Sequence, residues 1–180
     1  MFKPRKLQDD ISMRLLVPND AAALTTALAR NRDHLAYWEP SRPQEYYTQE
    51  WQATDIASRL ADHATGTAHP FALVAGDAIV GRFNLAGIVR GPFQTSILSY
   101  WVDGRYTGRG LACAAVQAII ESARADLGLH RIEASTLLDN AGSQRVLLKS
   151  GFQQIGMAPQ YLKIAGKWQD HNLYQMLLHS

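Results

Sequence analysis

This sequence offers little support for disulfide bonds, membrane spans or zinc sites. Its 180 residues include one cysteine, Cys113, so an intrachain disulfide is excluded, and one small thiol in an apolar helical stretch fits a reducing compartment. The six histidines and the cysteine show no zinc-binding spacing, so we expect no metal. No apolar run approaches ~20 residues and residues 1–10 are polar and basic, so we expect neither a membrane span nor a signal peptide. These absences favour a protein of the cytoplasm.

The charge balance is also too even to indicate a partner. Eighteen lysines and arginines stand against sixteen acidic residues, and a net charge of +2 is too weak to argue for nucleic acid. Hydrophobic residues make up 47% of the chain, which is enough for a real core. The length suits one domain, so we expect a single domain over residues 1–180, with residues 1–11 as a flexible tail.

Hydrophobic periodicity predicts a mixed arrangement of strands and helices. Helical spacing predicts helices over residues 21–32, 48–64, 111–127 and 141–150, and an ordered, aromatic-rich loop over residues 34–43. Strand patterns occur over residues 12–17, 71–75, 78–90, 93–103, 131–138, 152–155, 161–164 and 167–178. One mixed sheet flanked by helices accommodates this order, which classes the fold as α/β or α+β.

A glycine-rich turn between a strand and the most apolar helix is the strongest local signal. Gly108 and Gly110 lie two apart, with Arg105 and Arg109 beside them. The first N–H groups of a helix have no intrahelical partner, and glycines let a ligand approach the backbone closely. The turn therefore suits a phosphate, although its glycines could equally serve backbone geometry alone.

The chain resembles the GCN5-related N-acetyltransferases. Its turn has the form Arg105-x-x-Gly108-x-Gly110-x-Ala112, which is similar to the acetyl-CoA motif of that family. The final hairpin, at residues 166–174, resembles the RimJ/RimL branch of ribosomal-protein N-terminal acetyltransferases. Further stretches that resemble the family lie at residues 130–134, 140–143 and 148–152, and those that resemble RimJ lie at residues 31–40 and 89–93.

This resemblance implies a fold and a donor. The fold is a single, mixed, mostly antiparallel twisted sheet of about seven strands, flanked by about four helices. Its fourth strand bulges and splays from the fifth, which here means residues 93–103 and 131–138. The donor is acetyl-CoA, and its pyrophosphate would lie against the N–H groups from Gly108 through Leu111 to Ala112, with Arg105 or Arg109 adding charge. The N–H of Val102 is the expected donor to the developing oxyanion.

The resemblance also implies roles near the acceptor. Asn140 would bind the pantetheine arm and Ser143 would stabilise the leaving thiolate, although capping of the helix that follows explains both residues equally well. Some RimL-like members carry a glutamate as base where this chain has Leu162. Glu39 is the leading replacement, with Asp170 beside His171 as the second candidate. The residues expected to contact the acceptor are Trp38, Glu39, Arg42, Tyr100 and Asp170.

The function expected from this resemblance is direct transfer of acetyl to the N-terminal α-amine of a ribosomal protein in a ternary complex. An α-amine is already partly neutral near pH 7, so a weak base suffices. Two alternatives remain open: acetylation of a small amine such as a polyamine, aminoglycoside or amino sugar, and a ribosome-assembly factor with a secondary acyl-CoA site. Contact with the ribosome and a homodimer are both left open by the sequence.

Overall fold

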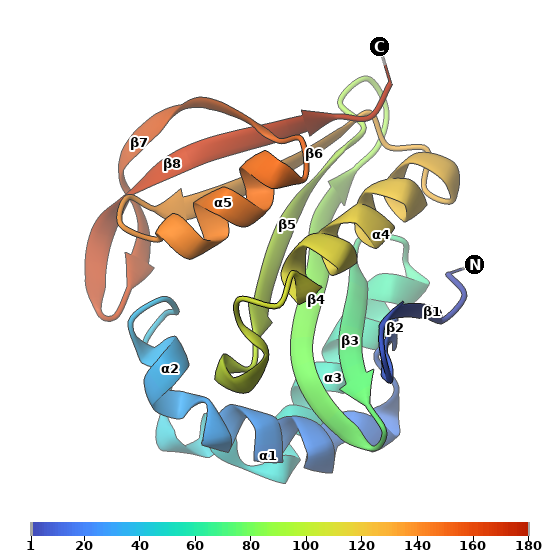
Figure 1. Cartoon of the computed structure of the whole chain (residues 1–180), viewed down its shortest axis with the longest axis vertical. Coiled ribbons are helices and arrows are strands. Elements are labelled where there is room, and N and C mark those ends of the chain that lie inside the picture. Colours follow the sequence, from blue (N-terminus) through green and yellow to red (C-terminus); the bar gives the residue numbers. More distant parts are fainter. Residues whose placement is uncertain (1, 180) are drawn as a thin grey trace.

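The computed structural model describes residues 2–179 as one eight-stranded sheet with helices on both faces (Figure 1). The strand order is β1-β2-β3-β4-β5-β6-β8-β7, and β5 with β6 is a parallel pair while the other neighbours are antiparallel. The strands are β1 (Arg5–Gln8), β2 (Ile11–Leu15), β3 (His69–Ala75), β4 (Ala78–Val89), β5 (Thr95–Val102), β6 (Arg131–Leu137), β7 (Gln153–Ile164) and β8 (Lys167–Leu177). The predicted mixed, mostly antiparallel sheet is confirmed.

Two hydrophobic clusters lie on opposite faces of this sheet. Helix α4 (Leu111–Ala125) buries Leu111, Ala115, Ile119 and Ala123 at four-residue spacing in the larger cluster, which also takes in α5 (Ala141–Lys149) through Leu147. Helices α1 (Ala21–Arg30) and α3 (Gln49–Ala64) build the smaller cluster, and a short helix α2 (Arg32–Ala36) follows α1. In Figure 1, α4 and α5 lie in front of the strands.

Asn31 divides the helix expected over residues 21–32. Its side chain donates to the carbonyl of Ala27 at 2.8 Å, and it accepts the N–H of Gly104 at 2.9 Å. An asparagine that bonds the backbone on both sides competes with helical hydrogen bonding, so α1 ends there and α2 begins in a new direction. The beginning of the predicted loop is therefore helical.

The N-terminal segment corrects the expectation of a flexible tail over residues 1–11. Residues 5–8 form β1, which pairs with β2 at the edge of the sheet and supplies the eighth strand. The rings of Phe2 and Phe71 meet edge to face, with centroids 4.7 Å apart, and Arg5 forms an ion pair with Glu121 on α4. Packing beyond the strand, rather than strand propensity, explains why this polar stretch is ordered. Residue 1 lies outside the described residues.

The expected splay of the sheet is confirmed between β5 and β6, which are the fourth and fifth predicted strands. They pair over residues Thr95–Ile97 and Arg131–Glu133, after which β6 continues to pair with β8 (Figure 1). The expected bulge in β5 is not where the irregularity lies. Register with β4 is unbroken from Ala86–Ile97 to Gly81–Val102, and the extra residue belongs to β4, between Ala86 and Val89.

Candidate active site

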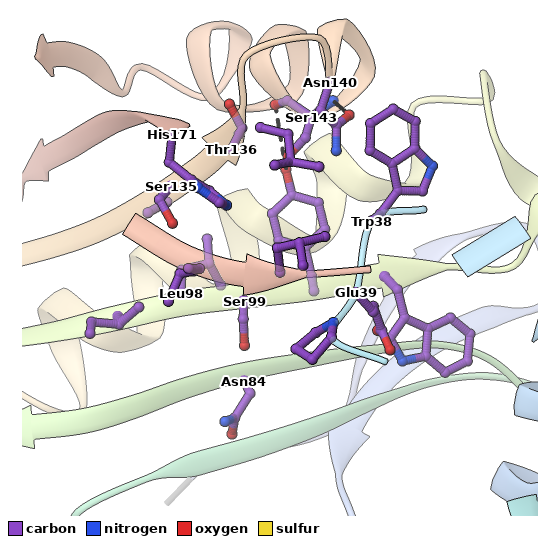
Figure 2. A pocket seen from close by; sticks show the side chains of 18 of the residues that line it. Trp38, Glu39, Asn84, Leu98, Ser99, Ser135, Thr136, Asn140, Ser143 and His171 are labelled. Carbon is purple, nitrogen blue, oxygen red and sulfur yellow. Dashed lines mark hydrogen bonds between the residues drawn. The ribbon is translucent and has the colours of Figure 1, made fainter. Parts of the chain in front are cut away.

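A cavity of about 350 Å³ occupies the splay between β5 and β6. The loop after α2 and the hairpin β7–β8 contribute its other walls, and Figure 2 shows side chains from all of these segments directed into it. It brings together most of the residues expected near the acceptor and the thiol, but not Val102, Asp170 or the glycine turn. The expected residues that line it are Trp38, Glu39, Arg42, Tyr100, Asn140 and Ser143.

The glycine turn has the geometry of an anion cradle. Gly108 and Gly110 have φ angles of +74° and +78°, which side chains rarely adopt, and a Cβ at Gly108 would meet nothing within 4 Å. The first intrahelical bond of α4 runs from Ala114 N–H to the carbonyl of Gly110, so the N–H groups of Leu111 and Ala112 have no intrahelical partner. These open N–H groups suit a pyrophosphate.

The N-terminal strand holds this cradle from outside. The Gln8 side-chain amide donates to the carbonyl oxygen of Arg109 at 3.0 Å. Because the N–H and the carbonyl of one peptide unit point in opposite directions, the N–H of Gly110 faces away from Gln8. Sequence reasoning missed Gln8, since no local signal links residue 8 to residue 109.

The two arginines of the turn differ in what they contact. Arg105 donates to both carboxylate oxygens of Asp103, each at 3.2 Å. Arg109 is exposed, with its guanidinium 5.5 Å from the centre of the Tyr106 ring. A charge already paired with a carboxylate adds little to an anion site, so this geometry favours Arg109 over Arg105.

Asp103 anchors the start of the turn to α1. It is 1% exposed and accepts a 2.8 Å bond from Nε of Arg30 as well as the bonds from Arg105. Burial alone would raise the pKa of Asp103, but hydrogen bonds from Arg105 and Arg30 outweigh it and hold that pKa well below its usual value. The carboxylate therefore stays ionised and fixes the turn.

The backbone of β5 directs two N–H groups into the splay. Asp103 N–H donates to the carbonyl of Val80 on β4 at 2.9 Å. Successive N–H groups of a strand point to opposite sides, so those of Val102 and Tyr100 point away from β4, towards the side where β6 has diverged. The N–H of Val102, the expected oxyanion donor, therefore points into the splay.

A tyrosine and a serine meet across the cavity. The hydroxyl oxygens of Tyr100 and Ser143 are 2.8 Å apart, and the Ser143 N–H donates to Oδ1 of Asn140 at 3.0 Å (Figure 2). Burial raises the pKa of Tyr100 to about 12, partly offset by its bond to Ser143. The capping role considered for Asn140 is observed, and its NH₂ group is not used by the cap.

Glu39 stands on the opposite side of the cavity from α5. Its carboxylate is 3.8 Å from the guanidinium of Arg42, which lies 4.6 Å from the centre of the Tyr46 ring. The backbone carbonyl of Glu39 accepts the N–H of Ala165, at the tip of the β7–β8 hairpin, at 3.0 Å. The hairpin and the loop are thereby tied together over the cavity.

Asp170 has a different place from the one expected. Its carboxylate accepts the N–H of Gln160 at 2.8 Å, where β7 departs from regular pairing and Gln160 has a φ of +47°. Asp170 therefore stabilises an irregular strand and does not line the cavity. Its neighbour His171 does line the cavity, and so does Leu162, at the position where RimL-like members carry a glutamate.

Several cavity residues with polar atoms were missed by the sequence analysis. Trp101, Asn84 and Thr136 each carry a buried polar atom without a hydrogen-bond partner among residues 2–179. Buried polar atoms usually have hydrogen-bond partners, and these three belong to residues that line the cavity. Alternation along a strand cannot distinguish a residue in the core from one that faces a cavity, and no other signal in the sequence marks them.

None of the helices among residues 2–179 is both long and apolar enough to cross a membrane. Within the same residues, histidine, cysteine, aspartate and glutamate side chains do not gather in groups of three or more that could hold a metal ion.

A helix opened by glycines, beside splayed strands and a polar cavity, defines the class of enzymes that transfer an acyl group from a donor with a phosphate-bearing tail. More particularly, the chain belongs to the GNAT acetyltransferases, because the family model described as acetyltransferase (GNAT) domain matches residues 10–153. The chain is 33% identical over 169 residues to the probable N-acetyltransferase YjcK of Bacillus subtilis, covering 93% of each protein. It is 34% identical over 174 residues to the ribosomal protein uS5-alanine N-acetyltransferase of Escherichia coli, covering 95% of this chain and 89% of that protein.

Solved structures agree with this assignment. The ribosomal-protein-S5-alanine acetyltransferase of Vibrio fischeri superposes with a TM-score of 0.95 at 30% identity, covering 99% of this chain and 98% of that one. Mycobacterium smegmatis RimJ in complex with CoA-disulfide superposes with a TM-score of 0.89 at 27% identity, covering 93% of this chain and 81% of that one. The expected resemblance to the GNAT family, and to its ribosomal-protein branch, is confirmed.

Proposed function

We propose that this acetyltransferase transfers the acetyl group of acetyl-CoA to the N-terminal α-amine of a ribosomal protein. The observation that carries the choice of a polypeptide acceptor is a second cavity, of about 290 Å³, next to the first. The two cavities share Leu35, Glu39, Pro40 and Arg42 as walls. Adjoining cavities suit an extended chain that enters amine first, whereas a small amine needs only one. The names of the relatives support a ribosomal protein as the acceptor.

In the proposed reaction, the donor lies along the splay with its pyrophosphate against the N–H groups that begin α4. The thioester carbonyl accepts the N–H of Val102, which stabilises negative charge as the amine attacks. Glu39 accepts the proton of the amine, directly or through water, and Ser143 donates a hydrogen bond to the sulfur that leaves. An α-amine has an unperturbed pKa of about 7.7–8.0, so a single carboxylate is a sufficient base.

Residues of a single chain provide every group that this scheme uses, so neither the intact ribosome nor a homodimer is required. The acceptor class is consistent with a cytoplasmic enzyme. Trp38 would pack against the first residue of the acceptor, and Arg42 would contact its backbone beyond Glu39. Asp170 has no part in the scheme, because its carboxylate is bonded to Gln160.

The test of this proposal is mass spectrometry of ribosomal proteins from cells with and without the gene. We expect one N-terminus to lose its acetyl group in the deletion strain. The purified enzyme should then acetylate a peptide with that N-terminus, and not the same peptide with a blocked α-amine. Activity on polyamines, aminoglycosides or amino sugars, without activity on the peptides, would instead support a small-molecule enzyme. A turn-glycine variant that lost transfer yet restored ribosome maturation would support an assembly factor.

A further inference from the structure

The contact between Tyr100 and Ser143 has a use beyond the roles assigned so far. We infer that Tyr100 is a positioning residue, whose phenol holds the Ser143 hydroxyl so that the serine proton points to the sulfur of the leaving thiol. The inference rests on the proposed function, in which Ser143 serves that sulfur. It adds the hydroxyl of Tyr100, on β5, which determines whether the Ser143 hydroxyl can donate to the sulfur.

The backbone of Ser143 is fixed by the cap of α5, so only the rotamer and the hydroxyl orientation of its side chain can vary. Its N–H donates to Asn140 in the first turn of α5. A serine side chain can still choose among three staggered rotamers, and its hydroxyl hydrogen rotates as well. The 2.8 Å bond to Tyr100 selects one of these arrangements.

Tyr100 is rigid enough to make that selection. It lies in β5 directly opposite Phe83 of β4, and the two rings are stacked, with centroids 4.9 Å apart and planes inclined by 7°. A strand residue whose ring is packed on a neighbour loses little further entropy when it holds a partner. The phenol oxygen is therefore a fixed point at the wall of the cavity.

The direction of the bond follows from acidity. Tyr100 keeps its proton at any physiological pH, because burial raises its pKa to about 12. Either hydroxyl could donate in the 2.8 Å contact, and the Tyr100 hydroxyl also lies 3.5 Å from the Ser143 carbonyl oxygen. A phenol is a stronger hydrogen-bond donor than an aliphatic hydroxyl, so in this inference Tyr100 donates and Oγ of Ser143 accepts. Within residues 2–179, Ser143 Oγ has no other hydrogen-bond partner, so its own O–H is left for a ligand in the cavity.

The chemical step balances without a proton from either hydroxyl. The amine nitrogen forms a bond to the thioester carbon, the carbon–sulfur bond breaks with its electron pair going to sulfur, and the nitrogen loses one proton to Glu39 or water. The sulfur takes up one proton, so the net change is transfer from nitrogen to sulfur. A thiol has a pKa of ~8.5, far below that of a serine or of Tyr100, so neither hydroxyl gives up its proton. Ser143 stabilises the thiolate by a hydrogen bond, and Tyr100 acts by holding Ser143.

A double-mutant cycle tests the inference. Tyr100→Phe removes the hydroxyl and keeps the ring, and it should lower kcat about tenfold with the KM for acetyl-CoA changed less than about twofold. Ser143→Ala should do the same. The double variant should be no slower than Ser143→Ala alone, because the phenol acts only through the serine. Tyr161→Phe, on an exposed tyrosine outside the cavity, is the matched control and should keep full activity.

Several results would overturn the inference. Losses that multiply in the double variant would show that the two hydroxyls act independently, and an unchanged kcat in Tyr100→Phe would remove its role. If Ser143→Ala kept full kcat, the role of the serine would fall too, while the acetyl transfer itself would stand. The proposed function fails separately, if the unmodified enzyme acetylates no ribosomal N-terminus. Thermal unfolding of each variant shows whether a loss of kcat comes from a loss of stability. A Tyr100→Phe substitution that destabilised the fold would also slow the enzyme that already carries Ser143→Ala.

Discussion

A negative charge at the beginning of α4 should weaken donor binding. Gly110→Glu adds a carboxylate to the turn that is expected to hold the pyrophosphate, and Gly110→Gln adds an uncharged side chain of the same size at the same position. The αL backbone at Gly110 costs either variant about 1–2 kcal/mol. The added Cβ meets the Gln8 side chain at 3.6 Å, which is ordinary van der Waals contact. The two variants therefore differ essentially in charge.

The size of that difference can be bounded. Two like charges ~4 Å apart repel by about 1 kcal/mol in water, and by about 4 kcal/mol at the effective dielectric constant near a protein surface. Gly110→Glu should therefore bind CoA at least about fivefold more weakly than Gly110→Gln. The ratio should shrink as salt is added, because added ions screen exposed charges.

Isothermal titration calorimetry with CoA at low and high ionic strength measures both variants, and thermal unfolding verifies that each is folded. Equal affinity of the two variants at every salt concentration would refute this placement of the pyrophosphate. Binding by Gly110→Glu as tight as that of the unmodified enzyme would refute the cradle as a whole.

Four further predictions concern the base, the turn and stability. Glu39→Gln should slow acetylation mainly below about pH 8, where the amine needs a base, and an unchanged pH–rate profile would exclude Glu39. Gln8→Ala should lower the affinity for CoA about threefold to tenfold, which corresponds to the free energy of one hydrogen bond. The kcat in steady-state assays should be unchanged. Asp103→Asn should lower the free energy of unfolding at pH 7 by about 1.5–3 kcal/mol in urea denaturation, because the bonds from Arg30 and Arg105 are to a charge. The pKa of Asp103 is lowered in the folded state, so this contribution is present above about pH 4 and is lost as the pH falls further. A difference in free energy of unfolding that stayed the same at every pH would contradict this account. The pKa of His69 is lowered to about 4 by burial and by His63, so the unfolded chain binds the proton first and the melting temperature should fall from about pH 6.5 to about pH 4. His69→Gln should flatten that fall, and an identical pH dependence in both proteins would show that His69 is not its source.

Local signals were sufficient for most of the fold. The apolar face of α4, the glycines of the turn and the adjacent strands 71–75 and 78–90 each depend on a few neighbouring residues, so a pattern in the sequence reports them directly. The same holds for the cap at Asn140. Strand β1 could not be predicted in this way, because four mixed residues have no period of their own and are ordered by packing on α4 and β2.

The candidate site was only partly predictable, because its geometry depends on contacts between distant residues. Arg30 and Asp103 are 73 residues apart, and nothing near either one marks the pair. Asp170 looked like a catalytic carboxylate beside a histidine, yet its oxygen satisfies the backbone of an irregular strand. Tyr100 and Ser143 were both expected near the reaction, but only the splay of the sheet brings their hydroxyls together.

The bond between Gln8 and the carbonyl of Arg109 makes the N-terminal strand and the donor site thermodynamically linked. Coupling free energy is reciprocal: the factor by which docking of β1 raises CoA affinity equals the factor by which CoA favours docking of β1. Because β1 is an edge strand, its ordering is among the easier parts of the sheet to lose. A filled donor site should therefore protect residues 5–8 from amide hydrogen exchange and from proteases, so the supply of CoA would govern how long the edge of this sheet stays closed.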